Sequence, residues 1–316
     1  GDTTYSKNTM YRMLNVSTHN WRRFLLTLSN KVIASMNQLT RPERVNVLVL
    51  DDTIIPRNRS KNVELLARVH DHTSNRYKKG FTMLTLGWSD GYSFIPTDFA
   101  MLSSSKKSNR YQEVSDSIDK RTCGYKRRVE SMQKKSDVAV QLIKNTLSQG
   151  IQASYVLMDT WFTHEPLFKS CLEEGIDVIG MVKQMKQTYT YQGKNFDLKD
   201  LRTMLPKCRN SNIIGSVLVT TKNGIPVKLV YVKNRNKKHD WLVILSTDCS
   251  LSNEEIVRIY GNRWSIEVFF KSTKSLMKLG NEFQGRSYDM MISHTTIVMT
   301  RYIMTEWLKR EEKDQK

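Results

Sequence analysis

The chain has 316 residues, of which 39% are hydrophobic, so it is long enough for two domains or one large one with a substantial core. Lysine and arginine number 50 against 31 aspartate and glutamate, and the net charge of +19 is spread along the chain, as expected of a protein that meets a polyanion. The sequence has no apolar run of about 18 residues and no basic amphipathic anchor, which argues against membrane binding.

The N-terminal part has the apolar spacing of helices. Ser6 is in position to cap a first helix, and the helical pattern continues to residue 39. The first piece has the form of the second helix of a helix-turn-helix whose partner is missing, although a plain helical hairpin fits equally well. We therefore expect residues 1–44 to be a helical segment.

The next part predicts three strands. Residues 45–53 (VNVLVLDDT) are a continuous β-branched and leucine run that ends in two acids, as in a buried strand. Strands over 80–91 and 92–102 follow, and the turn Ser-Asp-Gly between them suits a hairpin. Residues 103–135 are polar and basic, and we expect them to be mobile.

Helices and strands then alternate. A helix over about 130–148 precedes residues 154–162 (SYVLMDTWF), which repeat the pattern of an apolar strand followed by an acid, here Asp159. A helix over 164–174 and a strand over 177–182 come next. These elements predict an α/β unit.

Residues 185–247 have a different texture, with short β-like runs separated by Gly, Asn and Lys turns. The runs lie at 188–191, 213–221, 227–233 and 241–246. They predict a small, mostly β insertion. Residues 248–316 contain a polar-faced helix, an apolar helix over 288–307 and a charged tail.

The segment IYGNRWSIEVFFKSTK, residues 259–274, sets five polar side chains among large apolar ones. They are Tyr260, Arg263, Glu267, Lys271 and Lys274. At about 100° per residue all five lie on one face of a helix, which a capping box of Ser252 and Glu255 begins. This face is either a solvated one with i,i+4 ion pairs or a phosphate-handling one with a single acid.

Acids follow two of the predicted strands, at Asp51 or Asp52 and at Asp159, and a later helix contributes Glu267. Carboxylate oxygens are preferred ligands of Mg²⁺, and three acids suit a pair of these ions. Such a site activates an attacking oxygen and stabilises the leaving one in displacement at phosphorus. An aspartate that closes a strand is more often a turn residue, so the prediction depends on all three acids together with the basic charge.

The spacing Tyr-x2-Arg-x3-Glu-x6-Lys gives the chain a resemblance to a known family. The four residues are Tyr260, Arg263, Glu267 and Lys274. With "IYGNRW", "IEVFFK" and "YVLMDTWF", they make most of residues 45–305 resemble DDE transposases of the IS-four family of bacterial insertion sequences. The resemblance implies an α/β fold with an RNase H-like core, in two parts over 45–184 and 248–316, and the β insertion of 185–247 between them.

The resemblance also implies cut-and-paste transposition. One strand is nicked, its 3′-hydroxyl attacks the opposite strand to form a hairpin, the hairpin is reopened, and the end is joined to target DNA. The implied catalytic and metal-binding residues are Asp51, Asp159 and Glu267, holding two Mg²⁺ ions that Mn²⁺ can replace. The implied partners are double-stranded DNA, both terminal inverted repeats and target, bound by a homodimer in the cytoplasm on the bacterial nucleoid.

Further residues are expected to touch DNA. The resemblance implies that Tyr260, Arg263 and Lys274 handle phosphates beside a distorted terminal nucleotide, and we add Lys271 from the same face. The basic stretch KRTCGYKRR offers phosphate contacts or is simply a solvated loop. Its candidates are Lys126, Arg127 and Arg128.

Trp241 opens a predicted strand after a basic run. A tryptophan is usually part of a core, but the placement of this one resembles that of the family's base-stacking tryptophan.

Two departures from the family matter. Its members usually carry a larger N-terminal DNA-binding domain, so residues 1–44 would be a remnant of it. The family often shows Asp, any residue, then Thr or Ser, which selects Asp51 with Thr53 over Asp52. In a regular strand Asp52 faces the opposite side.

Other candidate ligands carry less weight. His70 and His72 flank an aspartate, but without a third ligand nearby we expect them at the surface. The four cysteines lack metal-ligand spacing and are expected to be free cytosolic thiols. Two other functions fit these residues: a catalytically silent DNA-binding protein derived from a transposase, and an RNase H-like nuclease that cuts without strand transfer.

Overall fold

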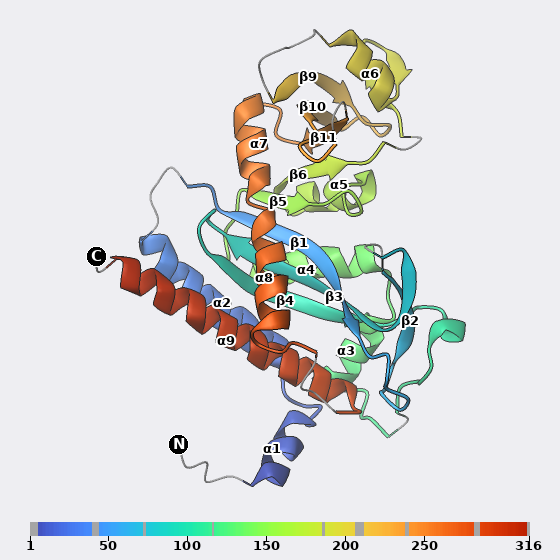
Figure 1. Cartoon of the computed structure of the whole chain (residues 1–316), viewed down its shortest axis with the longest axis vertical. Helices are drawn as coiled ribbons and strands as arrows, with labels where there is room; N and C mark the ends of the chain where they lie inside the picture. The colour runs from blue at the N-terminus through green and yellow to red at the C-terminus, as the bar shows by residue number, and fades with distance from the viewer. Residues whose placement is uncertain are drawn as a thin grey trace.

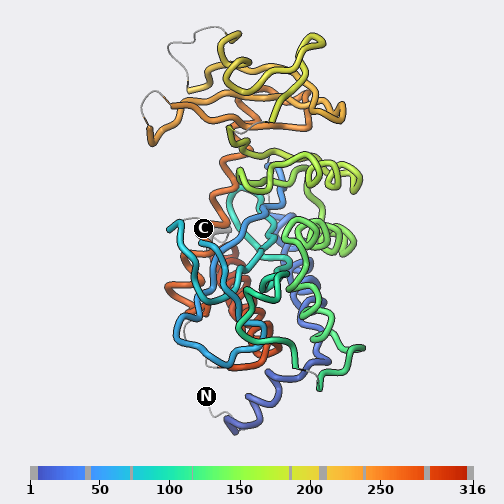
Figure 2. Tube along the Cα trace, turned by 90° about the vertical axis from the view of Figure 1, so that its right-hand side faces the viewer, coloured from blue at the N-terminus to red at the C-terminus, as the bar shows by residue number. Residues whose placement is uncertain are grey.

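The computed structural model describes most of the chain. The described residues are 6–39, 44–71, 74–115, 117–184, 187–205, 212–237, 240–280 and 285–314. The molecule is elongated, with the β-rich part of residues 185–247 at one end and the helix of residues 7–14 at the other (Figure 1; Figure 2).

One mixed sheet of eleven described strands runs through the molecule. The strands are β1 (Val47–Pro56), β2 (Ala67–Asp71), β3 (Arg76–Ser89), β4 (Phe94–Leu102), β5 (Tyr155–Met158), β6 (Asp177–Val182), β7 (Tyr189–Tyr191), β8 (Lys194–Phe196), β9 (Ile213–Thr220), β10 (Pro226–Lys233) and β11 (Trp241–Ser246). Their order is β2-β3-β1-β5-β6-β11-β10-β9-β7-β8. Strand β4 stands outside this order and pairs with β3.

The helices cover this sheet on both sides. They are α1 (Lys7–Leu14), α2 (Trp21–Gln38), the short 3₁₀ helix η1 (Lys107–Asn109), α3 (Cys123–Ser131), α4 (Lys135–Ser148), α5 (Glu165–Glu173), α6 (Leu198–Met204), α7 (Asn253–Gly261), α8 (Trp264–Ser275) and α9 (Tyr288–Asp314). The green α4 and α5 lie on one side of the sheet and the orange α8 on the other (Figure 2). Helices α2 and α9 pack side by side, while α1 projects from the body (Figure 1).

The centre of the sheet is built from strands that are covered on both faces. Residues 47–50 of β1 are all fully buried, and every residue of β4 is buried. A strand covered on both faces buries the side chains of each face, which explains the continuous apolar run at the start of β1. Strand β1 pairs antiparallel with β3 and parallel with β5, and β5 pairs parallel with β6.

The sequence-based assignments of the strands agree with this structure, including the four short runs of residues 185–247. These runs are not a separate sheet, because β11 pairs antiparallel with β6 and extends the central sheet. Strands β2 and β8 were not expected from the sequence. Among the described residues, no helix combines the length and apolar character that a membrane crossing requires.

Two expectations about helices were wrong. Residues 103–135 were expected to be mobile, but they include η1 and α3, and α3 has five buried residues. The single helix expected to carry Tyr260 through Lys274 is two helices, α7 and α8, that meet at Asn262 and Arg263. Gly261, the last residue of α7, stands directly before this break, but the apolar periodicity continues across it and did not locate it.

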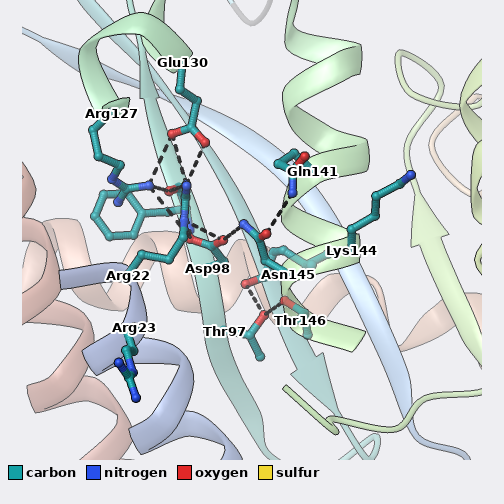
Figure 3. Close-up of polar contacts among 12 residues, drawn as sticks. Arg22, Arg23, Thr97, Asp98, Arg127, Glu130, Gln141, Lys144, Asn145 and Thr146 are labelled. Carbon is teal, nitrogen blue, oxygen red and sulfur yellow. Dashed lines mark hydrogen bonds and ion pairs between the residues drawn. The ribbon is translucent and has the colours of Figure 1, made fainter. Parts of the chain in front are cut away.

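A buried cluster of ionic side chains joins α2, α3 and α4 to β4 (Figure 3). Arg22 lies 2.9 Å from a carboxylate oxygen of Asp98 and 2.8 Å from one of Glu130. Asn145 of α4 also donates to the Asp98 carboxylate, at 3.2 Å. Because the Asp98 side chain is fully buried, these contacts are what allows a charge to lie inside the fold.

Candidate active site

The strand register brings two of the predicted acids together. Leu50 of β1 is aligned with Met158 of β5 in a parallel pair, so Asp51 and Asp159 are the next residues of the same register. Aligned residues of neighbouring strands project to the same face of a sheet. Two acids that lie 108 positions apart in the sequence therefore leave the sheet side by side.

The turn after β5 holds Asp159 in place. Its carboxylate accepts hydrogen bonds from the backbone N–H groups of Trp161, at 2.9 Å, and Phe162, at 3.2 Å. The hydroxyl of Thr163 donates to the Asp159 carbonyl at 2.7 Å. Burial raises the pKa of Asp159 above its ordinary value, although the two N–H donors oppose the shift.

Glu267 reaches the site from the helix that crosses β1. The buried face of α8, formed by Ile266, Phe269, Phe270 and Thr273, packs onto the sheet (Figure 1). Glu267 lies beside this face with 36% of its side chain exposed. Burial of one helical face thus fixes α8 over β1 and leaves the carboxylate at the edge of the site.

A single guanidinium connects the first and third acids. Arg263 Nη1 lies 3.3 Å from Asp51 Oδ2, and Arg263 Nη2 donates to Glu267 Oε1. The guanidinium also lies over the ring of Tyr260, with 6.0 Å between its central carbon and the ring centroid. Arg263 thereby holds together carboxylates that come from β1 and α8.

The site carries more negative charge than its own cations neutralise. Burial and the nearby Asp159 together raise the pKa of Asp51 to about 7, while Arg263 acts in the opposite direction. A buried carboxylate whose neighbour is another carboxylate favours its neutral form unless a cation is close. Additional positive charge is what this cluster requires in order to be fully ionised.

Asp51 and Asp52 project to opposite sides, as strand alternation predicts. Asp51 and Thr53 face α8, because they contact Arg263 and Lys274 respectively. Asp52 instead forms an ion pair with Lys135, the first residue of α4. The geometry therefore puts Asp51, and not Asp52, on the side of Glu267.

The remaining polar residues of this helical face differ in their surroundings. Tyr260 is 9% exposed, and burial raises the pKa of its phenol. Lys274 Nζ donates to Thr53 Oγ1 at 2.5 Å and to the Ile54 carbonyl at 3.0 Å. Lys271 is exposed to solvent. The five residues therefore do not form one solvated stripe, because four of them, all but Lys271, contact β1 or one another.

Trp241 and Lys126 lie away from the acids. Trp241 begins β11 and is partly buried, with 5.4 Å between its ring centroid and that of Tyr231. The Lys126 side chain on α3 is exposed. Neither has contacts that assign it a role.

Arg127 and Arg128 were expected to contact DNA, and the structure corrects this expectation. Arg128 is 1% exposed, and its guanidinium contacts Glu64 at 2.7 Å and Asp289 at 2.8 Å. Arg127 is 7% exposed and donates to the Phe99 carbonyl at 2.6 Å. Both side chains point into the fold because α3 is a helix with a buried face, which a basic sequence does not reveal.

Two residues beside the acids were missed by the sequence-based reasoning. Lys135 pairs with Asp52, and its ammonium lies 3.5 Å from the centroid of the Trp161 ring. The ring of Trp161 is 41% exposed just after Asp159. The exposed tryptophan in "DTWF" was the available signal, whereas Lys135 was indistinguishable from the basic residues around it.

Within the described residues, no group of three or more His, Cys, Asp or Glu side chains is arranged to hold a metal ion. The donor set nevertheless suits a divalent cation of the Mg²⁺ type, since Asp51, Asp159 and Glu267 offer only carboxylate oxygens. The raised pKa of Asp51 agrees with this, because a nearby cation would favour its charged form. Such a cation would compete with Arg263 for the carboxylates of Asp51 and Glu267.

The chain was compared with known proteins. A search of curated proteins found no match. Among solved structures, a catalytic domain of human endonuclease V with four cysteine substitutions aligns with a TM-score of 0.32 and 10% identity, covering 86% of this chain and 99% of that one. That similarity is too weak to assign a fold.

Two family models match with much of the chain. One describes a DDE superfamily endonuclease and matches residues 2–194, and the other describes a transposase DDE domain and matches residues 133–300. Each match covers more than half of the chain, and together they include all three acids of the site. The chain therefore belongs to the DDE transposase and endonuclease superfamily.

Proposed function

We propose that the chain is a transposase that cleaves transposon ends through a hairpin intermediate and joins them to target DNA. The observations that carry the proposal are that Asp51 and Asp159 share one register of neighbouring strands and that Arg263 links Asp51 to Glu267. The strand order β4-β3-β1-β5-β6, with three antiparallel strands followed by two parallel ones, supports an RNase H-like core. The spacing of Tyr260, Arg263, Glu267 and Lys274 supports membership of the IS-four family.

In this proposal Asp51, Asp159 and Glu267 hold two Mg²⁺ ions, which Mn²⁺ can replace. When bound, such ions supply the activation of an attacking oxygen and the stabilisation of a leaving one. The three carboxylates are suited to this role because they are hard oxygen donors at the edge of the sheet, two of them largely removed from water.

Arg263 exchanges partners in this scheme. In the DNA-free chain its guanidinium neutralises Asp51 and Glu267. A guanidinium binds a phosphate in the same forked manner as a carboxylate, so Arg263 can turn to a DNA phosphate once cations neutralise the two acids. Tyr260, packed against Arg263, restricts the side-chain positions from which this turn begins.

Four further contacts complete the proposed DNA interface. Lys271, Lys274 and Lys126 bind phosphates, and the partly exposed ring of Trp241 stacks on a base flipped from the transposon end. Two copies of the chain act together on double-stranded DNA, one on each terminal inverted repeat, in the cytoplasm on the bacterial nucleoid. The net charge of +19 supports binding over a broad phosphate surface.

The test uses DNA that carries the inverted repeats flanking the chain's own gene. We expect nicking, a hairpin product and joining to a second duplex, each dependent on Mg²⁺ or Mn²⁺. Asp159→Ala is the matched inactive variant. Cleavage without joining would point to a nuclease, and metal-independent binding without cleavage would point to a catalytically silent DNA-binding protein.

A further inference from the structure

An open groove lies beside the acids, and the proposed chemistry does not account for it. Its volume is about 700 Å³, and it is formed by β1, β2 and β3, the segment 102–105, and the start of α4. The lining includes Asp52 and Thr53, the residues next to Asp51 in β1. The groove is therefore continuous with the edge of the candidate active site.

The groove is strongly basic. Five cationic side chains line it, against the two carboxylates of Asp52 and Asp71. The cations are Arg68, Lys78, Lys134, Lys135 and Lys274. Both carboxylates are already paired, Asp71 with Lys78 at 2.6 Å and Asp52 with Lys135. The lining thus keeps an excess of positive charge, which suits an anionic ligand.

Two of these cations are displayed to solvent without an ion-pair partner in the described part of the chain. Lys134 is exposed at the beginning of α4, where its side chain makes no capping hydrogen bond. Arg68 is exposed on β2, with its guanidinium 4.0 Å from the centroid of the Tyr77 ring. A stacked guanidinium is held in one orientation yet keeps its N–H donors available.

Helix α8 relates the groove to the acids. Glu267 lies toward the start of α8, whereas Lys274, about two helical turns later, lines the groove. Helix α7 and the strands that carry Trp241 lie beyond the other end of α8 (Figure 1). A DNA strand that passes over the acids from the Trp241 side therefore continues into the groove.

The size of the groove limits what it can hold. A volume of about 700 Å³ is within the range of about 300–1,000 Å³ found for small-ligand sites. Such a space accepts a few nucleotides of one strand and not a duplex. Serine hydroxyls at residues 103–105 and the exposed amide of Gln133 offer further hydrogen bonds to sugar and phosphate oxygens.

We infer that this groove binds the sugar-phosphate backbone of a single DNA strand separated from its complement next to the cleaved phosphodiester. The inference depends on the proposed function for its substrate. The groove is an additional binding site. Its phosphate contacts, Arg68 and Lys134, belong neither to the three acids nor to the Tyr-Arg-Glu-Lys residues.

The experiment measures binding in EDTA, so that no cleavage occurs. Two DNA probes share one duplex sequence, and one of them ends in a three-nucleotide single-stranded overhang. Fluorescence anisotropy gives the affinity of each probe between 50 and 200 mM salt. Each phosphate contact with a single strand contributes about 0.7 to the slope of log affinity against log salt concentration.

We expect the unchanged chain to show a steeper slope with the overhang probe than with the blunt probe. Arg68→Gln with Lys134→Gln should reduce the overhang slope by about 1.4, for two contacts, and leave the blunt slope unchanged. Lys194→Gln is the matched control, because Lys194 is exposed on β8, at the opposite end of the sheet from β2. It should change neither slope.

An unchanged overhang slope in the double variant would overturn the inference, as would an equal loss with both probes. Charge reversal at the same two positions tests the two phosphate contacts a second time. Circular dichroism melting verifies that each variant is folded. Cleavage of cognate DNA by the unchanged chain is assayed separately with Mg²⁺. The groove can thus fail while cleavage is observed, and cleavage can fail while the groove binds the overhang.

Discussion

The guanidinium of Arg263 lies 3.3 Å from the carboxylate of Asp51, although 212 positions separate the two residues in the chain. The same guanidinium binds Glu267, one helical turn further along α8. In the DNA-free chain an arginine therefore neutralises two acids that we propose as metal ligands.

This relationship predicts a competition between Arg263 and the metal. Arg263→Gln should increase the affinity for Mn²⁺, because the carboxylates of Asp51 and Glu267 lose the cation that pairs with them. It should also slow DNA cleavage by about 10²–10³-fold, the usual cost of losing one donor that stabilises a transition state. Titration calorimetry with Mn²⁺ and a nicking assay measure the two effects. Weaker Mn²⁺ binding by the variant would contradict the competition.

The two adjacent aspartates should respond differently to substitution. Asp51→Ala should reduce cleavage to the level seen without metal, since Asp51 projects to the side of Glu267. Asp52→Ala should keep measurable cleavage and lose about 1 kcal/mol of stability, because Lys135 loses its partner. The nicking assay and thermal melting separate these outcomes. If Asp52→Ala were the inactive variant, the assignment of the first acid would be wrong.

Trp241 should matter for the hairpin and not for the first nick. Flipping a base costs a few kcal/mol, and an aromatic face returns about 1–3 kcal/mol per base. Trp241→Ala should therefore form hairpins roughly ten- to hundredfold more slowly while nicking at the normal rate. Trp241→Phe, which keeps an aromatic face, should restore most of the rate. A normal hairpin rate in Trp241→Ala, or unfolding of that variant, would show that the ring acts in packing, as its contact with Tyr231 allows.

Arg128 should contribute to stability and not to DNA binding. Arg128→Ala removes the shared partner of Glu64 and Asp289 and leaves two acids buried together. The expected loss is about 3–5 kcal/mol in the free energy of unfolding, measured by urea denaturation. Lys126→Ala, an exposed neighbour on α3, should change stability by less than about 0.5 kcal/mol. A stable Arg128 variant with weakened DNA binding would show that Arg128 contacts DNA and is not a packing residue.

The stability contributed by Glu64 should depend on pH. Hydrogen bonds from Arg128, Tyr288 and Ser115 hold the pKa of Glu64 below its ordinary value of 4.5, against the effect of burial. A lowered pKa gives stability that is fully present above the unfolded value and is lost as the pH falls through the folded value. Glu64→Gln should therefore be less stable than the unchanged chain at pH 7, and the difference should narrow below about pH 4. A difference that is constant from pH 7 to pH 3 would exclude the ionised carboxylate as its source.

The local pattern of the sequence was sufficient for much of the fold. Apolar runs located β1 and β5, because a strand buried on both faces needs a continuous apolar segment, and short β-like runs between turns located β7, β9, β10 and β11. Asp51 and Asp159 could be identified as candidates because each comes directly after a buried apolar run, although β1 continues past Asp51 to Pro56 and only Asp159 follows its strand. The period of a regular strand also predicted that Asp51 and Asp52 project to opposite sides.

Only the tertiary structure decided which charges are buried. The sequence KRTCGYKRR does not distinguish the exposed Lys126 from the buried Arg127 and Arg128, because their partners lie on segments as distant as Glu64 and Asp289. The basic groove likewise combines residues of β2, α4 and α8 that no spacing relates. Local sequence determines how each segment can fold, but the environment of a charge depends on which distant segments pack against it, and packing is a property of the whole chain.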